Sequence, residues 1–562
     1  MSILRSSSSN FLVSAVTLTI LYAWGGDSLR AQEAWFEDIR EAAGIDFRHI
    51  SGHRERCYLP EIVGGGVGLL DFDRDGFLDI YFVQSGSVYT SAAQTSENRL
   101  YRSRGDGTYV NVTAAARLAG SGYGMGCACG DYDGDGDADI YVTNLGANEL
   151  FRNNGDGTFT DVTVAAGVGD PGWSTSASFF DYDSDGQLDL IVVNYVNWSR
   201  EGDPECLVRG RADYCHPRNY SPAPDTLYRN RGNGTFENVT RKAKLNHAYG
   251  NGLGVACGDF NGDGREDIYV ANDGTMNQLW INSGDGTFTD EALIAGCALN
   301  IEGVAEAGMG VEAVDVEHDG DLDLFVSHFR GETNTLYLND RGDFEDVTGP
   351  RGLAAASTAF TGFGLGFADF NHDTQLDVYV VNGRVLQVKP SYSPTDPYAE
   401  PNQLFRGSKD GRFEEVLPHG GTAASLLGTS RGAAFGDLDN DGAVDIVVSN
   451  RDGSPYVLRN KVGSTGKWIQ FSVLDRKGRI AVGARLRIVT GERWQWRRVQ
   501  PGYGFCSSND PRVHCGLGTF ARVDAVEVLW SRDDRETFGP FEAEKLHELR
   551  QGAGRRSSRV RD

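Results

Sequence analysis

Aspartates recur in this chain at a spacing that suits a metal ion. A nine-residue pattern, D-x-[DEN]-x-D-G-x-x-D in consensus, occurs seven times. Its copies begin at Asp71, Asp131, Asp181, Asp259, Asp315, Asp369 and Asp437. Ca²⁺ takes six to eight oxygen ligands, and a tight loop offers them from side chains at positions 1, 3, 5 and 9 and from the backbone carbonyl at position 7. The pattern therefore predicts seven calcium-binding loops.

The predicted ligands occupy these five positions in every loop, and position 7 acts through its carbonyl oxygen. They are Asp71, Asp73, Asp75, Phe77 and Asp79; Asp131, Asp133, Asp135, Asp137 and Asp139; Asp181, Asp183, Asp185, Gln187 and Asp189; Asp259, Asn261, Asp263, Arg265 and Asp267; Asp315, Glu317, Asp319, Asp321 and Asp323; Asp369, Asn371, Asp373, Gln375 and Asp377; and Asp437, Asp439, Asp441, Ala443 and Asp445. In the first loop, Gly76 supplies the positive φ that turns the chain around the ion. The sixth loop departs most from the pattern, because Asn371 stands at position 3 and Thr374 replaces the glycine.

Two other interpretations of these loops are weaker. An EF-hand needs Glu at position 12, whereas Phe82, Val142 and Val192 stand there in the first three loops. The aspartates could instead form only Asx-turns between strands, but a turn does not require three or four carboxylates in so short a segment. Such a cluster repels itself by several kcal/mol unless a cation neutralises it.

The same loops explain the acidity of the chain. Asp and Glu number 79 against 53 Lys and Arg, which gives a net charge of −26. A surface of this sign does not release counterions from a polyanion, and this argues against a nucleic-acid partner. Because the loop carboxylates account for most of the excess, the acidity does not require a cationic partner.

Strand and turn signals around each loop predict an all-β fold. An apolar, glycine-containing run precedes each loop, a β-branched run follows it, and a hairpin turn such as Asp106-Gly107 comes next. Four-stranded units of this kind cannot bury both faces alone, so we expect them to pack as the blades of a seven-bladed β-propeller. The last repeat lacks its fourth strand and residues 36–39 match it, so we expect this segment to pair near Tyr456 and close the ring.

The repeats are similar to FG-GAP/VCBS repeats, as in the integrin α-subunit head. Roughly residues 467–550 resemble the ASPIC/UnbV domain of the cartilage-acidic-protein family. This second match rests on Val482-Gly483-Ala484-Arg485, Gly502-Tyr503-Gly504-Phe505, Asn509-Asp510-Pro511-Arg512-Val513-His514, Gly516-Leu517-Gly518 and Val526-Glu527-Val528-Leu529-Trp530. The resemblance implies an extracellular calcium-binding propeller with an adhesion or matrix role. We expect a signal peptide at 1–31, the propeller at 32–462, a small all-β ASPIC/UnbV domain at 463–550 and a basic disordered tail at 551–562.

The N-terminal segment and the cysteines point to export, to a secreted, periplasmic or extracellular location. An apolar run from Phe11 to Tyr22 follows Arg5 and precedes the small Ala31, which is typical of a secretory signal. The run is shorter than the roughly 20 residues that span a membrane. Nine cysteines in an exported chain can form disulfides, with at least one thiol left free. We expect pairs Cys206–Cys215 and Cys506–Cys515, buried thiols at Cys127, Cys129 and Cys257, and no assignment for Cys57 and Cys297.

Two functions from different classes fit these features. The first is a secreted adhesion or ligand-binding module for an extracellular protein or glycan, in which calcium rigidifies the propeller and nothing inserts into a membrane. Long insertions at 195–225 and 384–402 are candidates for its contact surface, because ordered loops on a rigid scaffold often carry binding residues. The second is an extracellular polysaccharide-degrading enzyme of the lyase type, which would use a Lys, Arg or Tyr together with Ca²⁺. Lys, Arg and His side chains that converge on the central channel beside a metal would distinguish it.

The sequence favours binding over catalysis. The strands expected to line the channel carry mainly Gly, Ala, Val and Phe, and neither a nucleophile elbow nor an H-E-x-x-H motif occurs. We therefore assign no catalytic residue. His318 and His372, at position 4 of the fifth and sixth loops, are expected to face solvent.

Overall fold

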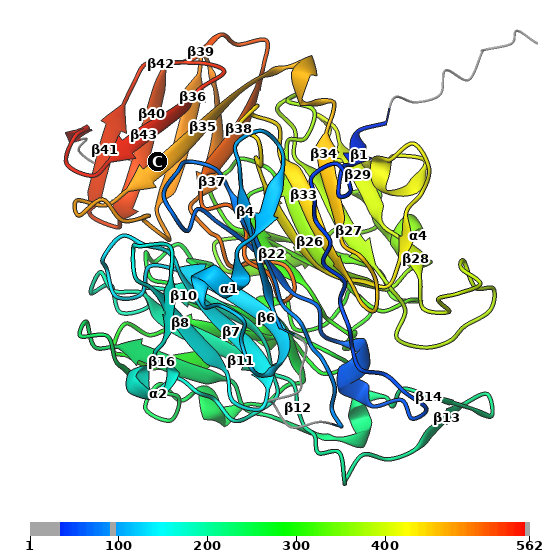
Figure 1. The fold of residues 1–562 in the computed structure, drawn as a ribbon. Helices are drawn as coiled ribbons and strands as arrows, with labels where there is room; N and C mark the ends of the chain where they lie inside the picture. The colour runs from blue at the N-terminus through cyan, green and yellow to red at the C-terminus, as the bar shows by residue number, and fades with distance from the viewer. Residues whose placement is uncertain (1–33, 90–96, 557–562) are drawn as a thin grey trace, which may run out of the picture. The chain divides into compact units, whose positions relative to one another are not determined.

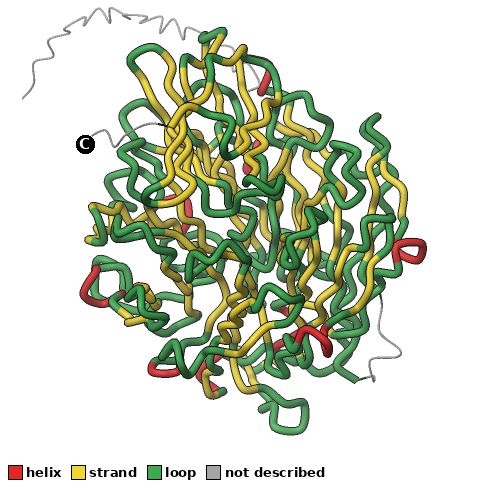
Figure 2. Tube along the Cα trace, turned by 90° about the vertical axis from the view of Figure 1, so that its left-hand side faces the viewer, coloured by secondary structure: helices red, strands yellow, loops and turns green. Residues whose placement is uncertain are grey.

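The structure, a computed structural model, describes residues 34–89 and 97–556. The expected signal peptide and residues 557–562 of the expected tail lie outside these ranges. Strands dominate the described chain and the helices are short (Figure 2). None of its helices is long and apolar enough to cross a membrane.

Seven four-stranded antiparallel sheets, each resembling a propeller blade, follow one another along the described chain. Sheet 1 contains β2 (Val67–Leu70), β3 (Asp79–Phe82), β4 (Arg99–Ser103) and β5 (Tyr109–Asn111); sheet 2 contains β6 (Tyr123–Gly130), β7 (Asp139–Leu145), β8 (Glu149–Asn153) and β9 (Phe159–Asp161); sheet 3 contains β10 (Ser174–Phe180), β11 (Asp189–Asn194), β16 (Thr226–Asn230) and β17 (Phe236–Asn238). Sheet 4 contains β18 (Gly252–Gly258), β19 (Asp267–Asn272), β20 (Gln278–Asn282) and β21 (Phe288–Asp290); sheet 5 contains β22 (Val311–Val314), β23 (Asp323–Val326), β24 (Thr335–Asp340) and β25 (Asp343–Asp346). Sheet 6 contains β26 (Gly362–Ala368), β27 (Asp377–Asn382), β29 (Gln403–Gly407) and β30 (Phe413–Glu415); sheet 7 contains β32 (Ser430–Gly436), β33 (Asp445–Asn450), β34 (Tyr456–Asn460) and β1 (Phe36–Asp38).

The N-terminal strand completes the last sheet. β1 pairs antiparallel with β34, with Phe36 opposite Asn460 and Asp38 opposite Leu458. This confirms the pairing that the sequence predicts, because the last repeat supplies only three strands of its own.

Neighbouring sheets share hydrophobic cores. The first strands of the sheets contact one another in chain order, and β2 of sheet 1 also contacts β32 of sheet 7. One buried cluster joins these two sheets, with Val67 and Ile80 on one side and Val447 and Val457 on the other. Burial of apolar faces between sheets is what a four-stranded unit cannot achieve alone.

The C-terminal segment forms further sheets with their own core (Figure 1). Three strands pair in the order β38 (Val513–Gly518), β35 (Lys467–Leu474) and β43 (Leu546–Arg550); five pair in the order β37 (Arg493–Arg498), β36 (Arg485–Thr490), β40 (Ala525–Ser531), β41 (Asp534–Phe538) and β44 (Arg555–Arg556); β39 (Arg522–Val523) pairs with β42 (Phe541–Glu542). We call residues 467–556 the C-terminal domain. Because β44 pairs with β41, residues 555–556 are strand, which corrects the expectation of a disordered tail for that part.

Short helices, 3-10 turns and two-stranded pairs occur in the segments between the strands of these sheets. They are helices α1 (Thr113–Ala116), α2 (Thr163–Ala166), α3 (Ala292–Ala295) and α4 (Ala354–Ser357); 3-10 turns η1 (Leu59–Ile62), η3 (Pro217–Asn219), η4 (Leu245–His247), η5 (His419–Gly421) and η6 (Gly463–Thr465); and strand pairs β12 (Val196–Asn197) with β15 (Ser221–Pro222), β13 (Cys206–Val208) with β14 (Arg211–Asp213), and β28 (Glu400–Pro401) with β31 (Leu427–Gly428).

Residues 501–512 of the C-terminal domain, which we call the central loop, lie against the first strands of several sheets. The backbone N–H of Leu69 donates to the Ser508 carbonyl at 2.9 Å, and that of Ser508 donates to the Val67 carbonyl at 3.0 Å. Gly504 exchanges two such bonds with Val311 on β22. The central loop therefore occupies space between the first strands of these sheets.

Glycines in the first strands make room for the central loop. A Cβ atom at Gly66 would lie 2.2 Å from the carbonyl oxygen of Cys506, and one at Gly126 would lie 2.7 Å from the Cα atom of the same residue. Arg431 on β32 donates to the carbonyl of Ile62 in η1 at 2.6 Å. The N-terminal segment and the central loop thus meet between the sheets.

The packing of the chain determines which cysteines form a disulfide and which remain free thiols. Cys206 and Cys215 form the predicted disulfide. The predicted Cys506–Cys515 bond is wrong: both thiols are free, because Cys506 is packed in the central loop and Cys515 in the core of the C-terminal domain. The thiols expected to be buried are so, Cys297 is buried as well, and Cys57 is half-buried and free.

Candidate metal centres

All seven aspartate loops share one backbone turn. In the first loop, the carboxylate of Asp71 accepts hydrogen bonds from the backbone N–H groups of Asp75 and Gly76, each at 3.0 Å. Positions 4 and 6 adopt positive φ in every loop, including Thr374, where φ is 79°. A β-branched residue is strained in that region, which fits the prediction that the sixth loop is the weakest.

The aspartate at position 9 ties each loop to the third strand of its sheet. Asp139 accepts a hydrogen bond from the Tyr132 N–H at 3.1 Å and another from the Asn153 N–H at 2.7 Å. The same pair of contacts recurs at Asp79, Asp189, Asp267, Asp323, Asp377 and Asp445. Position 9 therefore has a structural role in addition to its predicted role as a ligand.

Four loops bring three carboxylates together. In each of them one carboxylate oxygen from positions 1, 3 and 9 lies within 4.8 Å of the others. The groups are Asp71, Asp73 and Asp79; Asp131, Asp133 and Asp139; Asp181, Asp183 and Asp189; and Asp437, Asp439 and Asp445. We call the loops that carry them, the first, second, third and seventh, the clustered loops.

Each clustered loop holds one buried carboxylate oxygen that has no hydrogen-bond partner among the described residues. These atoms are Oδ1 of Asp73, Asp133, Asp183 and Asp437. A buried anion without a partner is costly, and hard cations such as Ca²⁺ bind carboxylate oxygens. The residues present therefore fit a divalent cation.

Burial makes these carboxylates poor anions without a cation. It raises the pKa of Asp79 to about 8, that of Asp131 to about 6 and that of Asp437 to about 7, chiefly through desolvation. Neighbouring carboxylates add to the rise at each of them. A bound cation would reverse this balance by favouring the ionised form.

The fourth, fifth and sixth loops, which we call the substituted loops, arrange position 3 differently. Asn261 and Asn371 donate through Nδ2 to the carboxylates of Asp263 and Asp373, each at 3.1 Å. In the fifth loop, Glu317 instead forms an ion pair with Arg351 at 2.9 Å. The position-3 side chain is thus held by a protein group in each of these loops, as it also is in the first and third loops, where Arg102 pairs with Asp73 and Arg229 pairs with Asp183.

The C-terminal domain covers two of the substituted loops. Trp494 Nε1 donates to the carbonyl of His318 at 3.0 Å, and the Gly518 N–H donates to that of His372 at 3.0 Å. The expectation that both histidines face solvent is wrong: His372 is buried, and His318 is half-buried with its pKa lowered by desolvation to about 4. The sequence offered no signal for this, because the covering residues lie more than a hundred positions away.

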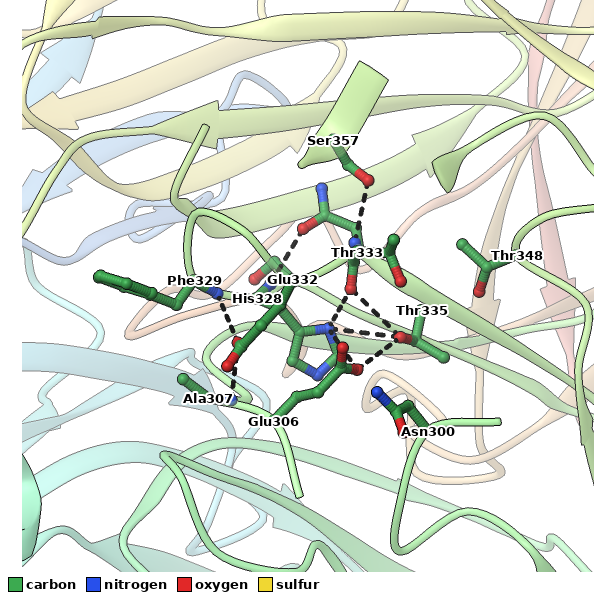
Figure 3. Close-up of polar contacts among 12 residues, drawn as sticks. Asn300, Glu306, Ala307, His328, Phe329, Glu332, Thr333, Thr335, Thr348 and Ser357 are labelled. Atoms are coloured by element: carbon green, nitrogen blue, oxygen red, sulfur yellow. Dashed lines mark hydrogen bonds and ion pairs between the residues drawn. The ribbon is translucent and has the colours of Figure 1, made fainter. Parts of the chain in front are cut away.

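A separate polar cluster surrounds His328, just after β23 (Figure 3). Its Nδ1 lies 2.7 Å from the carbonyl oxygen of Thr333 and must donate, since a carbonyl only accepts. The Glu306 carboxylate lies 3.8 Å from the same nitrogen and accepts a bond from the Thr335 hydroxyl at 3.1 Å. Glu332 accepts from two backbone amides.

His328 replaces a structural asparagine. In five other sheets an Asn at the same place donates through Nδ2 to a carbonyl in the segment that leads to the third strand, as His328 does through Nδ1. These residues are Asn144, Asn194, Asn272, Asn382 and Asn450. Among the described residues, His328 joins no group of three ligand atoms like those of the clustered loops, so we assign it to the fold.

The two long insertions contact each other. The Tyr398 hydroxyl donates to Asp213 Oδ1 at 2.9 Å, and the backbone N–H of Gln387 donates to Asp213 Oδ2 at 2.7 Å. The rings of Tyr214 and Tyr398 lie 5.5 Å apart. We call residues 195–225 and 384–402 the insertion platform; on it Leu207 is 65% exposed.

Family models match most of the chain. A model described as FG-GAP-like repeat matches residues 71–142, 131–192, 200–270, 259–326, 315–380 and 395–448, and a model described as ASPIC and UnbV matches residues 474–556. Cartilage acidic protein 1 of Xenopus tropicalis is 28% identical over 311 residues, which cover 53% of this chain and 44% of that protein. Its Homo sapiens counterpart is 28% identical over 296 residues, which cover 50% of this chain and 41% of that protein. The chain thus spans less than half the length of these relatives.

Two solved structures are similar in fold at low identity. A lectin of Agrocybe aegerita that recognises non-reducing terminal N-acetylglucosamine is 17% identical, with coverage of 68% of this chain and 88% of that one and a TM-score of 0.39. The BP39L lectin of Burkholderia pseudomallei is 11% identical, with coverage of 71% and 96% and a TM-score of 0.41.

Proposed function

The chain belongs to the FG-GAP-like repeat family, and on this premise we propose that it is a secreted, calcium-stabilised seven-bladed β-propeller that binds an extracellular protein or glycan through its insertion platform. The Cys206–Cys215 disulfide supports an extracellular location, because such bonds persist in oxidising compartments.

Calcium is the cation that the clustered loops suit best. Their ligands would be the carboxylates at positions 1, 3, 5 and 9 with the carbonyl at position 7, an all-oxygen set typical of Ca²⁺. The unpartnered Oδ1 atoms of Asp73, Asp133, Asp183 and Asp437 support this assignment. The ion would stabilise the turn between the first two strands of each sheet.

Ring closure by β1 would make the scaffold rigid. The contact between β2 and β32 and the core shared by sheets 1 and 7 support closure. A chain that starts after Asp38 would leave β34 as an exposed sheet edge. We expect it to melt well below the full chain, and an unchanged melting temperature would contradict closure.

The contact between the two insertions is the observation that supports a binding role. Long surface loops without a purpose are seldom ordered, yet here Asp213 of one insertion accepts hydrogen bonds from two residues of the other. The disulfide further constrains the hairpin that presents Leu207 and Arg211. A rigid scaffold that presents ordered loops is a common design for recognition.

Binding arrays test this proposal directly. The calcium-loaded full chain would be applied to arrays of extracellular glycans and matrix proteins, and each ligand found would be retested with Leu207→Ser/Arg211→Ser. We expect the double variant to lose binding, and Val164→Ser, an exposed change on α2 outside the platform, to retain it. Equal loss in both variants, or ligands cleaved rather than bound, would refute the platform as a binding surface.

A further inference from the structure

A cavity of about 130 Å³ lies between the first strands of sheets 5 to 7 and the C-terminal domain. A protein cavity of about 150 Å³ holds one benzene molecule, so the space suits a ligand of about six non-hydrogen atoms. The insertion platform takes no part in its walls.

A carboxyl group and a guanidinium line this cavity, and the described residues form no ion pair between the two. Glu312 on β22 is only 6% exposed, and its Oε2 accepts a hydrogen bond from the Phe367 N–H at 2.8 Å. Arg497 on β37 donates to the carbonyl of Trp496 at 2.7 Å and to Gln495 Oε1 at 2.8 Å. Burial raises the pKa of Glu312 to about 8 and the nearby Arg497 opposes that rise, yet the described residues give Arg497 no carboxylate partner.

The other arginines of the cavity wall have partners on other elements. Arg512 forms an ion pair with Asp510 at 2.8 Å, Arg498 pairs with Glu266, and Arg485 donates to the carbonyl of Gly320 and lies over the Trp496 ring. Among the described residues, the hydrogen bonds of Arg497 go to oxygens of its own strand, which leaves Arg497 as the arginine best placed for a ligand carboxylate. Gln500 Nε2 is a further buried donor with no partner among the described residues.

We propose that this cavity binds a small amino acid, with its carboxylate on Arg497 and its ammonium group on Glu312. Charge-assisted hydrogen bonds of this kind are the strong ones, and a buried charge is favourable only when it is paired. A zwitterion satisfies both poles at once and has about the size that the cavity admits. The aromatic rings of Tyr503 and Phe435, stacked 6.4 Å apart, supply an apolar wall beside it.

Binding to the calcium-loaded full chain tests this assignment with three probes. They are alanine, propionate, which lacks the ammonium group, and ethylamine, which lacks the carboxylate. By calorimetry and thermal shift, we expect alanine to bind about tenfold or more tightly than either single-charge probe, a difference of about 1.4 kcal/mol. No binding of alanine, or equal binding of all three, would overturn the proposal.

Matched variants locate the site. Arg497→Gln should abolish the response to alanine and propionate, whereas Glu312→Gln should remove the preference for alanine over propionate. Arg487→Gln is the control, because Arg487 pairs with Glu527 on the neighbouring strand and does not line the cavity. If a variant fails to fold, the three probes on the unchanged chain still decide. Calorimetry and thermal shift with these probes do not involve a ligand of the insertion platform. A negative result would therefore refute the cavity site without affecting the proposed binding role of the platform.

Discussion

The clustered loops and the substituted loops have the same backbone turn but different chemistry. Both kinds keep positive φ at positions 4 and 6 and the double backbone contact of position 9. Only the clustered loops gather three carboxylates and leave a buried oxygen without a partner. The turn alone therefore does not bring three carboxylates together, and the residue at position 3 is Asp in all four clustered loops and in none of the substituted loops.

Substitution at position 3 changes how a loop is neutralised. In the fourth loop the amide of Asn261 donates to Asp263, and Arg265 contacts the same carboxylate. In the fifth loop the longer Glu317 reaches Arg351. Ion pairs at position 3 are not confined to the substituted loops, because Arg102 pairs with Asp73 and Arg229 pairs with Asp183, each at 2.6 Å. The clustered loops differ in the three carboxylates that they bring together.

Removal of calcium should have the largest effect. A site held at a hundredfold excess over Kd contributes about 2.7 kcal/mol, so four sites contribute roughly 10 kcal/mol if they are independent. For a chain of this length, that corresponds to a fall in melting temperature of roughly 10 °C. Thermal melts with and without chelator measure it, and an unchanged melting temperature would show that the clustered loops do not bind a stabilising ion.

The number of bound ions tests the comparison most directly. We expect native mass spectrometry to find about four Ca²⁺ per chain, one for each carboxylate group. Seven ions would break the distinction and restore the seven sites that the sequence pattern predicts. Three or fewer ions would mean that at least one of the four carboxylate groups does not bind calcium.

Asp133→Asn should convert the second loop to the substituted kind. The change keeps the shape of the side chain but removes the carboxylate whose Oδ1 has no partner. We expect one ion fewer and a loss of about 1 to 3 kcal/mol in the free energy of unfolding. Asp137→Asn in the same loop is the control, because that side chain pairs with Arg74 and contributes only its carbonyl oxygen; a similar loss in both variants would speak against Asp133 as a ligand.

Asn261→Asp is the reverse exchange and should have the smallest effect. The new carboxylate completes a set of three in the fourth loop but loses the hydrogen bond to Asp263. We expect one more ion at high calcium and a change of less than about 1 kcal/mol in unfolding free energy, since a gained ligand and a lost hydrogen bond nearly cancel. Calcium titration followed by mass spectrometry reports it; an unchanged ion count would mean that the loop lacks more than one ligand.

Local pattern predicted the repeated parts of this molecule and missed the unique ones. The loops, the strands around them and the pairing of β1 with β34 follow from a motif that recurs along the chain. The position of the central loop does not, because it depends on contacts between residues such as Ser508 and Leu69 that are far apart in sequence. The failed Cys506–Cys515 pair has the same cause: proximity in sequence suggested a bond, and packing in two different cores prevents it.

The candidate site was predictable only to the level of the motif. The spacing of the motif is enough to place Asp71 and Asp131 in loops. It does not predict that Glu317 pairs with Arg351, because Arg351 comes from the segment after β25. The burial of His372 likewise comes from the C-terminal domain. The spacing of the motif predicts which residues could bind a metal ion. Contacts with residues far away in the sequence decide which of those side chains remain available to bind it.

The pairing of β1 with β34 delays completion of the fold during synthesis. The Asp38 carboxylate accepts a hydrogen bond from the backbone N–H of Val457, and these two residues are 419 positions apart. At a synthesis rate of about 5 to 20 residues per second, the first strand waits roughly 20 to 80 s for its partner, and the central loop emerges later still. High contact order also slows the final search. During this interval β1 and the first strands already made are open to other chains. A factor that holds the chain until β34 and the central loop have emerged should therefore raise the yield of folded protein.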